Sequence, residues 1–207
     1  DANGTLADKI CAFLSEEFVA KSDFHVDIHS GDMVEKLDPC IIVCAPKESE
    51  NNAFAGEVAK HTSFKYRLNS GGRTEFYNSS SIDRNVPSLL FERGAHGDWS
   101  KEEVDADKSD LINIMKFLNI LPGEAALNES QIFVKRHEWA EAEATGLLYM
   151  LVDAGDDVKE GQKLAEICDM FGNVINEVHA KFDGHVLIIA STLAIKKGDD
   201  LITYGQS

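Results

Sequence analysis

One stretch decides the fold of this chain: Phe24-His25-Val26-Asp27-Ile28-His29-Ser30-Gly31-Asp32. Apolar and polar side chains alternate along it up to a Ser-Gly turn, which predicts a strand over residues 24–29 with His25, Asp27 and His29 on its polar face. A metal-ligating histidine usually gives its other ring N–H to a carboxylate or a carbonyl group, so His29 is a candidate metal ligand and Asp27 the residue that orients it. The alternative is that Asp27 and His29 only cap the strand end, because a lone Asp-x-His pair is a weak motif.

The segments around this strand indicate a layered α/β domain. Thr5-Leu6-Ala7-Asp8 is a capping signal, and apolar side chains then recur every four residues as far as Phe18, so we expect an amphipathic helix that packs against a core. Cys40 to Cys44 is apolar on both faces, as a strand in the middle of a sheet should be. Further along, the pattern predicts a helix at about 50–61, a short strand at 64–68, and either a short helix or an active-site loop at 73–86.

A second chemically active residue ends a later strand. Ser88-Leu89-Leu90-Phe91-Glu92 is apolar up to its terminal carboxylate, and a glycine-rich loop that contains His96 follows it. In open α/β sheets functional groups gather where strands end, so we expect Glu92 and His29 to share one edge. A glutamate that closes an apolar run tends to be partly desolvated, which raises its pKa and suits Glu92 to carry a proton. His96 is a candidate for the mouth of the site. The alternative is that Glu92 pairs with Arg93 or a backbone amide and has no chemical role.

The α/β pattern ends with a long helix. Ser100-Lys101-Glu102-Glu103 is a capping box, apolar side chains follow at helical spacing, and Pro122-Gly123 stops the helix. From Gln131 onward the pattern changes to short alternating strands separated by turns. We therefore expect two domains, an α/β domain over residues 1–125 and an all-β domain over residues 126–207.

The all-β domain contains what look like two copies of one turn, Gly155-Asp156-Asp157-Val158 and Gly198-Asp199-Asp200-Leu201. Such internal symmetry is similar to that of the barrel-sandwich modules that carry biotin or lipoyl groups. A carrier needs a lysine at an exposed hairpin tip, and the candidate tip, Asp169 to Asn173, has none. We expect this domain to be a structural module or a lid.

The bulk composition excludes several classes of protein. With 36 acidic and 20 basic residues among 207, the net charge of −16 repels phosphate backbones and anionic lipids, so neither nucleic acid nor membrane is an expected partner. No apolar run approaches the length of a membrane span, and no signal pattern opens the chain. The cysteines lack metal-knuckle or redox spacing and are expected to be buried free thiols in a reducing cytoplasm; they are Cys11, Cys40, Cys44 and Cys168.

The motifs resemble those of a known family. Ser22 to Gly31 is similar to a strand segment of the succinylglutamate desuccinylase/aspartoacylase family, which are zinc hydrolases related to the zinc carboxypeptidases. Pro87 to Gly94 is similar to the strand that carries their catalytic glutamate, and the region from Ala144 to the end resembles their C-terminal β domain. The resemblance spans nearly the whole chain and implies a zinc-carboxypeptidase-like mixed sheet with flanking helices, followed by a small barrel-sandwich-like domain.

The resemblance also implies a reaction. It makes His29 a ligand of Zn²⁺ and Glu92 the residue that takes a proton from water and passes it to the leaving amine, in the hydrolysis of an N-acyl amino acid or similar small amide. The family carries an H-x-x-E zinc pair and an anion-binding segment upstream, and this chain has neither, so we expect it to be N-terminally incomplete.

Other assignments stay open at this stage. Arg67, Arg73 and Arg84 are candidates for binding a substrate carboxylate, and nothing in their spacing selects one. A carboxypeptidase-like peptidase and a non-catalytic binding module that keeps the fold are alternative functions. The sequence leaves homo-oligomerisation open.

Overall fold

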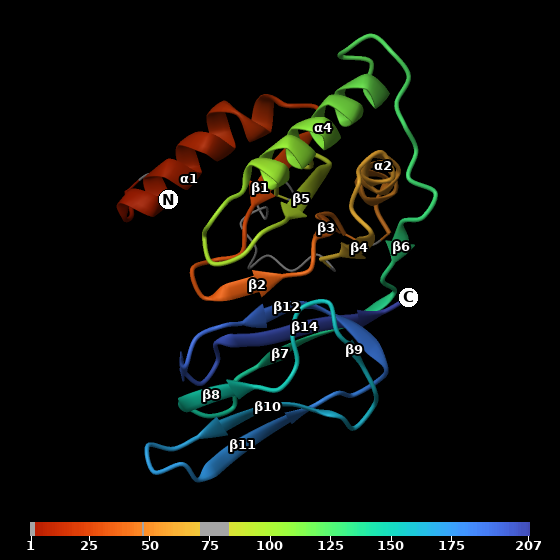
Figure 1. Cartoon of the computed structure of the whole chain (residues 1–207). Helices are drawn as coiled ribbons and strands as arrows, with labels where there is room; N and C mark the ends of the chain where they lie inside the picture. The colour runs from red at the N-terminus through yellow and green to blue at the C-terminus, as the bar shows by residue number, and fades with distance from the viewer. Residues whose placement is uncertain (1–2, 47, 71–82) are drawn as a thin grey trace. The chain divides into compact units, whose positions relative to one another are not determined.

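The computed structural model describes residues 3–46, 48–70 and 83–207, which form two compact units (Figure 1). The first, the α/β unit, contains Asp1–Ile28, Ile41–Phe91 and Ala106–Gln131. The second, the β-rich unit, contains His29–Cys40, Glu92–Asp105 and Ile132–Ser207. Both units are therefore discontinuous along the chain, and the strand ends that carry His29 and Glu92 belong with the β-rich unit.

The α/β unit is built around a sheet in which four strands follow the order β1-β5-β3-β4. The helices and strands among the described residues up to 117 are α1 (Leu6–Glu17), η1 (Val19–Lys21), β1 (His25–His29), β2 (Glu35–Leu37), β3 (Cys40–Val43), α2 (Glu50–Ala59), β4 (Tyr66–Asn69), β5 (Ser88–Glu92) and α4 (Lys101–Phe117). Of these, β2 belongs to the β-rich unit. The predicted strand at 24–29, the helix at 50–61 and the strand at 88–92 are thus confirmed. Most of the segment 73–86, whose structure the sequence left undecided, lies outside the described residues.

The core of the α/β unit lies between this sheet and the helices α2 and α4. Ile41 and Val43 of β3, together with Leu89 and Phe91 of β5, pack against α2 and α4, including Ile114 of α4. These strand residues alternate along their strands and therefore point to one face of the sheet. All four residues of β3 are buried, which confirms the prediction of a strand in the middle of a sheet.

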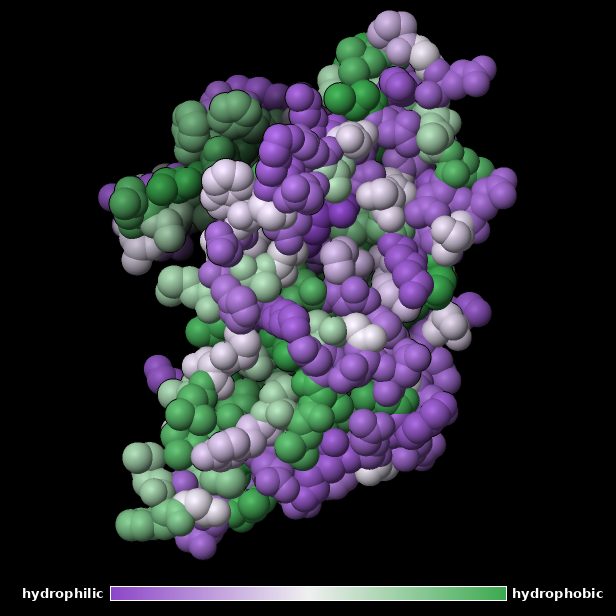
Figure 2. Space-filling view, in the orientation of Figure 1, coloured by the Kyte–Doolittle hydropathy of each residue, from purple (hydrophilic) through white to green (hydrophobic). Residues whose placement is uncertain are grey.

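The N-terminal helix α1 differs from its prediction in one respect. Thr5 and Asp8 form the expected capping box, but none of the residues of α1 is buried. Leu6 and Phe13 are 74% and 58% exposed, and apolar side chains gather over α1 on the surface in Figure 2. The expectation of packing against a core is wrong within the described residues, because helical periodicity shows which face is apolar and not what covers it. Cys11, on the same helix, is exposed and not buried as predicted, whereas the other three cysteines are buried.

The β-rich unit consists mainly of two sheets, with strand orders β11-β10-β8-β13 and β2-β12-β14-β7, and β9 pairs with β12. Its remaining strands are β6 (Ile132–Phe133), β7 (Arg136–Glu141), β8 (Gly146–Met150), β9 (Asp157–Val158), β10 (Lys163–Cys168), β11 (Val174–His179), β12 (Gly184–Ala190), β13 (Ala194–Ile195) and β14 (Asp200–Gln206). The prediction of short alternating strands after Gln131 is confirmed. Among the described helices, none is long and apolar enough to cross a membrane.

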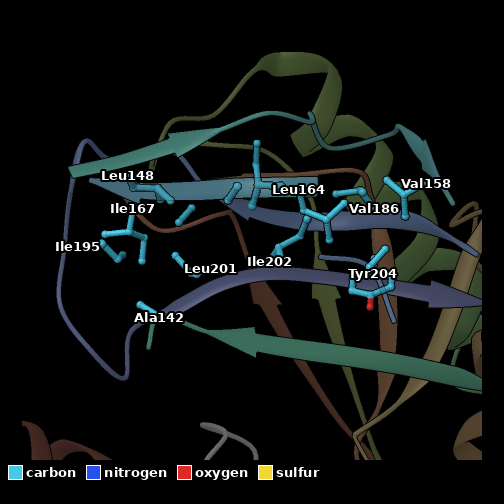
Figure 3. Packing of buried hydrophobic residues seen from close by; sticks show 14 of the residues in the cluster. Ala142, Leu148, Val158, Leu164, Ile167, Val186, Ile195, Leu201, Ile202 and Tyr204 are labelled. Carbon is cyan, nitrogen blue, oxygen red and sulfur yellow. The ribbon is translucent and has the colours of Figure 1, made fainter. Parts of the chain in front are cut away.

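The two sheets of the β-rich unit share one apolar core (Figure 3). Leu164 and Ile167 of β10 pack in the same cluster as Val186 of β12 and Leu201 of β14. Tyr204, 1% exposed, also belongs to it, and its hydroxyl group accepts a hydrogen bond from the backbone N–H of Lys181 at 2.8 Å. This bond satisfies the one polar group that burial of a tyrosine brings into an apolar core.

The repeated turn of the β-rich unit occurs three times. In each copy the backbone N–H of the first residue donates to the side-chain oxygen of the fourth, and the fourth N–H donates back to the first carbonyl oxygen. The third residue is a glycine with a φ of +96°, +79° or +91°, which side-chain-bearing residues rarely adopt. The copies are Asp153-Ala154-Gly155-Asp156, Lys159-Glu160-Gly161-Gln162 and Lys196-Lys197-Gly198-Asp199.

The hairpin tip between β10 and β11 is held by Asp169. Its carboxylate accepts hydrogen bonds from the backbone N–H groups of Phe171 and Asn173 at 2.8 and 2.9 Å and from the Asn173 side chain at 2.8 Å. These bonds lower the pKa of Asp169. Met170 and Phe171 stand exposed at the tip, where a cofactor carrier would present its lysine.

Replacing Leu164 with alanine tests the shared core directly. Leu164 is fully buried, so Leu164→Ala is expected to lower the free energy of unfolding by about 2–5 kcal/mol, through lost transfer energy and the cavity left behind. The matched control is Leu193→Ala in the same unit, because Leu193 is 56% exposed and its truncation should change stability by less than about 0.5 kcal/mol. Urea denaturation measures both values. Equal losses in the two variants would contradict this packing.

Candidate functional site

His29 and Glu92 occupy equivalent positions at the ends of neighbouring strands. β1 and β5 are adjacent in the sheet. The backbone N–H of His25 donates to the carbonyl oxygen of Pro87 at 3.0 Å, and the N–H of Arg93 donates to that of His29 at 3.2 Å. The bonded residues advance together along both strands, so β1 and β5 run parallel. Their carboxyl ends, which carry His29 and Glu92, lie where open α/β sheets place functional groups.

The two side chains lie together at this edge. The Nδ1 atom of His29 is 3.8 Å from the Oε1 atom of Glu92. The His29 side chain is 34% exposed and can be reached from solvent, whereas that of Glu92 is only 13% exposed. An accessible imidazole beside a sheltered carboxylate can bind a cation or a water molecule and accept a proton.

Cys40 lies close enough to Glu92 for the negative charge of Glu92 to affect the pKa of its thiol, but Cys40 is not a nucleophile in this arrangement. Burial raises the pKa of the Cys40 thiol well above its ordinary value, and the negative charges of Glu92 and Asp38 raise it further. The thiolate is the reactive form of cysteine, so Cys40 stays an inert thiol.

Glu35 is a residue that sequence reasoning missed. Its carboxylate accepts a hydrogen bond from the backbone N–H of Asp32 at 3.1 Å. Burial raises the pKa of Glu35, the bond from Asp32 lowers it, the charges of Asp32 and Asp200 raise it, and His29 lowers it. Glu35 is thus a second carboxylate within electrostatic reach of His29. The signal for it in the sequence is the Asp32-x-x-Glu35 spacing, which is that of a side chain closing a turn.

The loop after Glu92 has a defined backbone. His96 has a φ of +60°, which is uncommon for a residue other than glycine, and Gly94 and Gly97 also have positive φ values. The backbone N–H of His96 donates to the carbonyl oxygen of Glu35 at 2.8 Å, and that of Gly97 donates to Gly31 at 2.7 Å. The His96 ring lies with its Nδ1 atom 3.2 Å from the hydroxyl oxygen of Ser191. His96 is therefore held on a loop that is fixed to the segment following His29.

Asp27, the predicted orienting residue for His29, is half-buried on β1. Its charge acts on His25, whose pKa is lowered by burial and raised by Asp27. The role of Asp27 toward His29 stays a prediction.

The three candidate arginines differ in their positions. Arg67 lies on β4 beside α2, where its guanidinium group is 2.9 Å from the position that a Cβ atom on Gly56 would occupy. Burial lowers its pKa, and the charge of Glu57 raises it. Arg84 is near α1, with its Nε atom 3.4 Å from the Ser15 hydroxyl oxygen. Arg73 lies outside the described residues. The role of all three arginines in substrate binding stays a prediction.

The donor set at His29 matches only part of a zinc site. A catalytic zinc ion takes about three protein ligands and keeps one position open. Within the part of the chain that the structure describes, no group of three or more His, Cys, Asp and Glu side chains could hold a metal ion. His29 supplies one imidazole, with the Glu92 carboxylate beside it, so a zinc site at this edge requires further ligands from outside the described residues.

Comparison with known proteins gives one curated relative. No family model matches the chain. An N-alpha-acetyl-L-2,4-diaminobutyric acid deacetylase from Halomonas elongata is 22% identical over 214 aligned residues, which include the whole of this chain. The chain spans 63% of the length of that relative.

Solved structures match along the whole chain as well. The product-bound ectoine utilization protein EutE (DoeB) from Ruegeria pomeroyi has a TM-score of 0.82 and 22% identity, with 100% of this chain and 65% of that chain covered. A succinylglutamate desuccinylase/aspartoacylase from Rhodobacter sphaeroides has a TM-score of 0.80 and 20% identity, with the same shares covered. The resemblance that the sequence motifs indicate is therefore confirmed: over its whole length this mixed α/β chain has the fold of the succinylglutamate desuccinylase/aspartoacylase family.

Proposed function

We propose that this chain belongs to a metal-dependent hydrolase that cleaves the amide bond of an N-acyl amino acid or a similar small amide. The observation that carries the proposal is the 3.8 Å approach of His29 to Glu92 at the ends of two parallel neighbouring strands. The shared fold supports it, as does the deacetylase from Halomonas elongata, which is named for an N-acyl amino acid.

In this proposal the two residues have different roles. His29 would hold a zinc ion together with ligands from outside the described residues, and the ion would supply a Lewis acid for the substrate carbonyl group and for water. Glu92 accepts the proton that the attacking water loses and delivers it to the nitrogen of the leaving amine. The sheltered position of Glu92 favours this role, because few bulk water molecules compete with the substrate for its carboxylate.

The β-rich unit has a supporting role in the same proposal. We propose that the finer resemblance also holds, with a carboxypeptidase-like sheet in the α/β unit and a barrel-sandwich-like β-rich unit. The β10–β11 tip presents Met170 and Phe171 in place of a lysine, which favours a structural module over a cofactor carrier.

A substrate comparison tests the class of reaction. The purified full-length protein is incubated with N-acetyl and N-succinyl amino acids and, in parallel, with peptides that have a free C-terminal carboxylate. The proposal expects release of the free amino acid from the N-acyl compounds. Release of the C-terminal residue from the peptides alone would replace the proposal with a carboxypeptidase-like peptidase, and no reaction with either set would favour a non-catalytic binding module.

The 207-residue chain by itself is expected to bind zinc weakly. A catalytic zinc ion is usually held by about three protein ligands, and one imidazole is not enough. The described residues contain no group of three or more side chains that could hold the ion. Titration with zinc, followed by removal of unbound metal, should leave well under one ion per chain. A tight site with one zinc per chain would contradict this prediction and would direct attention to His25 and His96 as further ligands.

A further inference from the structure

His185 of β12 lies between two carboxylates outside the candidate site. Its Nε2 atom is 2.7 Å from Oδ2 of Asp38, and its Nδ1 atom is 2.8 Å from Oδ1 of Asp157. The side chains of His185 and Asp38 are 17% and 30% exposed, whereas that of Asp157 is 87% exposed. Both distances are those of hydrogen bonds, so the ring is held on two sides by groups from different segments of the chain.

The two bonds require a charged ring. A neutral imidazole carries one N–H group and one bare nitrogen, whereas an ionised carboxylate can only accept hydrogen bonds. A neutral His185 would therefore bond to one carboxylate and oppose the other with its lone pair. The arrangement is satisfied on both sides only when His185 is an imidazolium ion.

His185 holds the segment that follows His29 in the chain and contains β2. Asp38 follows β2, and its backbone N–H donates to the carbonyl oxygen of Leu187 at 2.7 Å. β2 pairs with β12, with Leu37 opposite Ile188. Glu35, at the start of β2, accepts the hydrogen bond from the backbone of His96. A continuous set of backbone bonds thus runs from β12 through β2 to the loop that follows Glu92.

We propose that His185 is a positioning residue: as an imidazolium ion between Asp38 and Asp157, it fixes β2 on β12 and thereby holds the loops that follow His29 and Glu92. The effect on catalysis rests on the proposed function, whereas the fixing of β2 does not. The β-rich unit lacks a carrier lysine, and the proposed fixing of β2 gives this unit a different role.

The charged groups on the elements packed against His185 are mostly carboxylates. Several carboxylates and two lysines stand on the elements packed against it, and each of these lysines is paired with a carboxylate of its own. These groups are Asp38 after β2, Lys36 of β2 with Asp153 at 2.5 Å, Asp156 before β9, Asp157 on β9, and Asp183 before β12 with Lys159 at 2.9 Å. On β14, the residue opposite His185 is Gly205, which adds no charge.

Hydrogen exchange of the full chain tests the proposal without any assay of activity. Exchange of the backbone N–H groups of residues 34–38, corrected for the intrinsic effect of pH, is compared at pH values below and above the titration of histidine. Loss of the ring proton removes one charged hydrogen bond, so protection of these groups should fall by about tenfold on the alkaline side. Protection that is equal on both sides would overturn the proposal.

Two substitutions separate the charge from mere packing. In Asp157→Asn, the new amide can donate to Nδ1 while Nε2–H still bonds to Asp38, so a neutral ring satisfies both sides and the pH dependence should disappear. His185→Gln should lower the protection of residues 34–38 at all pH values, whereas His179→Gln on β11, whose histidine is exposed, should behave as the wild type. We call the pairing of the charged His185 ring with Asp38 and Asp157 the clamp. An unchanged pH dependence in Asp157→Asn, or unchanged protection in His185→Gln, would show that this clamp does not exist.

Kinetics of the full-length protein then decide the positioning role. His185→Gln should lower kcat on N-acyl amino acids about tenfold with little change in KM. The wild-type protein should lose kcat at alkaline pH, whereas the Asp157→Asn variant should keep it. Altered protection with unchanged kcat would refute the positioning role and leave the clamp standing. If the wild-type protein has no hydrolase activity, the proposed function is wrong. The hydrogen-exchange data still test the clamp, because they do not depend on activity.

Discussion

Glu92→Gln in the full-length protein is expected to lower kcat for hydrolysis of an N-acyl amino acid by about 10²–10⁴-fold. This is the range that general acid–base catalysis typically contributes. Glutamine keeps the shape of the side chain, but its amide cannot accept a proton from water and deliver it to the leaving amine. The zinc content and the unfolding midpoint should remain those of the wild type, and KM should change less than kcat, because the interaction lost belongs to the transition state.

Glu102→Gln is the matched control for this substitution. Glu102 lies exposed in the first turn of α4, and removing its charge should leave kcat unchanged. If Glu92→Gln retained near-normal turnover with zinc bound, Glu92 would be a structural strand cap. The proton carrier would then have to be sought among the neighbouring groups, first in the loop that holds His96 and Asp98.

His29→Ala is expected to differ in kind, because it removes metal and activity together. A ligand contributes directly to the affinity for the ion, and changes to the partners of ligands alone cost about 10–100-fold in affinity or activity. Loss of the ligand itself should therefore lower zinc affinity by more than about 100-fold, and turnover should fall in parallel. Metal analysis of the purified variant beside its kcat measures both effects.

The control for His29→Ala is His179→Ala in the β-rich unit. The His179 side chain is 44% exposed and lies 3.9 Å from Glu177 on the same strand, so its removal should alter neither metal content nor turnover. A His29→Ala protein that lost activity while keeping its full zinc content would show that His29 acts on the substrate and does not hold the metal.

The strands that carry the candidate site could be predicted from the sequence, because the local pattern determines them. Alternation gave β1, and the apolar run before Glu92 gave β5. The rule that functional groups gather at strand ends then anticipated that His29 and Glu92 lie together, although their roles remain predictions.

Other features could not be predicted, because they depend on contacts between distant segments. The pairing of β2 with β12 joins residues about 150 positions apart, and it places the segment 29–40 with the β-rich unit. No periodicity in Glu35-Lys36-Leu37 reveals that partner. For the same reason the electrostatic link from Glu35 to His29 and the position of His185 between Asp38 and Asp157 became visible only in the folded chain.

The helix α1 shows a different limit of sequence reasoning. Its capping box and its apolar stripe were both predicted correctly, yet the stripe is exposed within the described residues. Capping is a local interaction between neighbours in the chain, whereas burial depends on which other surface is present.

If the edge formed by His29 and Glu92 belongs to a zinc-dependent deacylase, as we propose, then turnover by the full-length protein depends on its metal, which metal exchange can show. Release of the free amine from an N-acetyl amino acid is followed in the protein as purified, after removal of metal by a chelator, and after addition of one equivalent of zinc. We expect turnover in the first state, its loss in the second and its recovery in the third. Undiminished turnover of the metal-free protein, or no turnover of any N-acyl amino acid by the zinc-loaded protein, would show that this edge does not belong to a zinc-dependent deacylase.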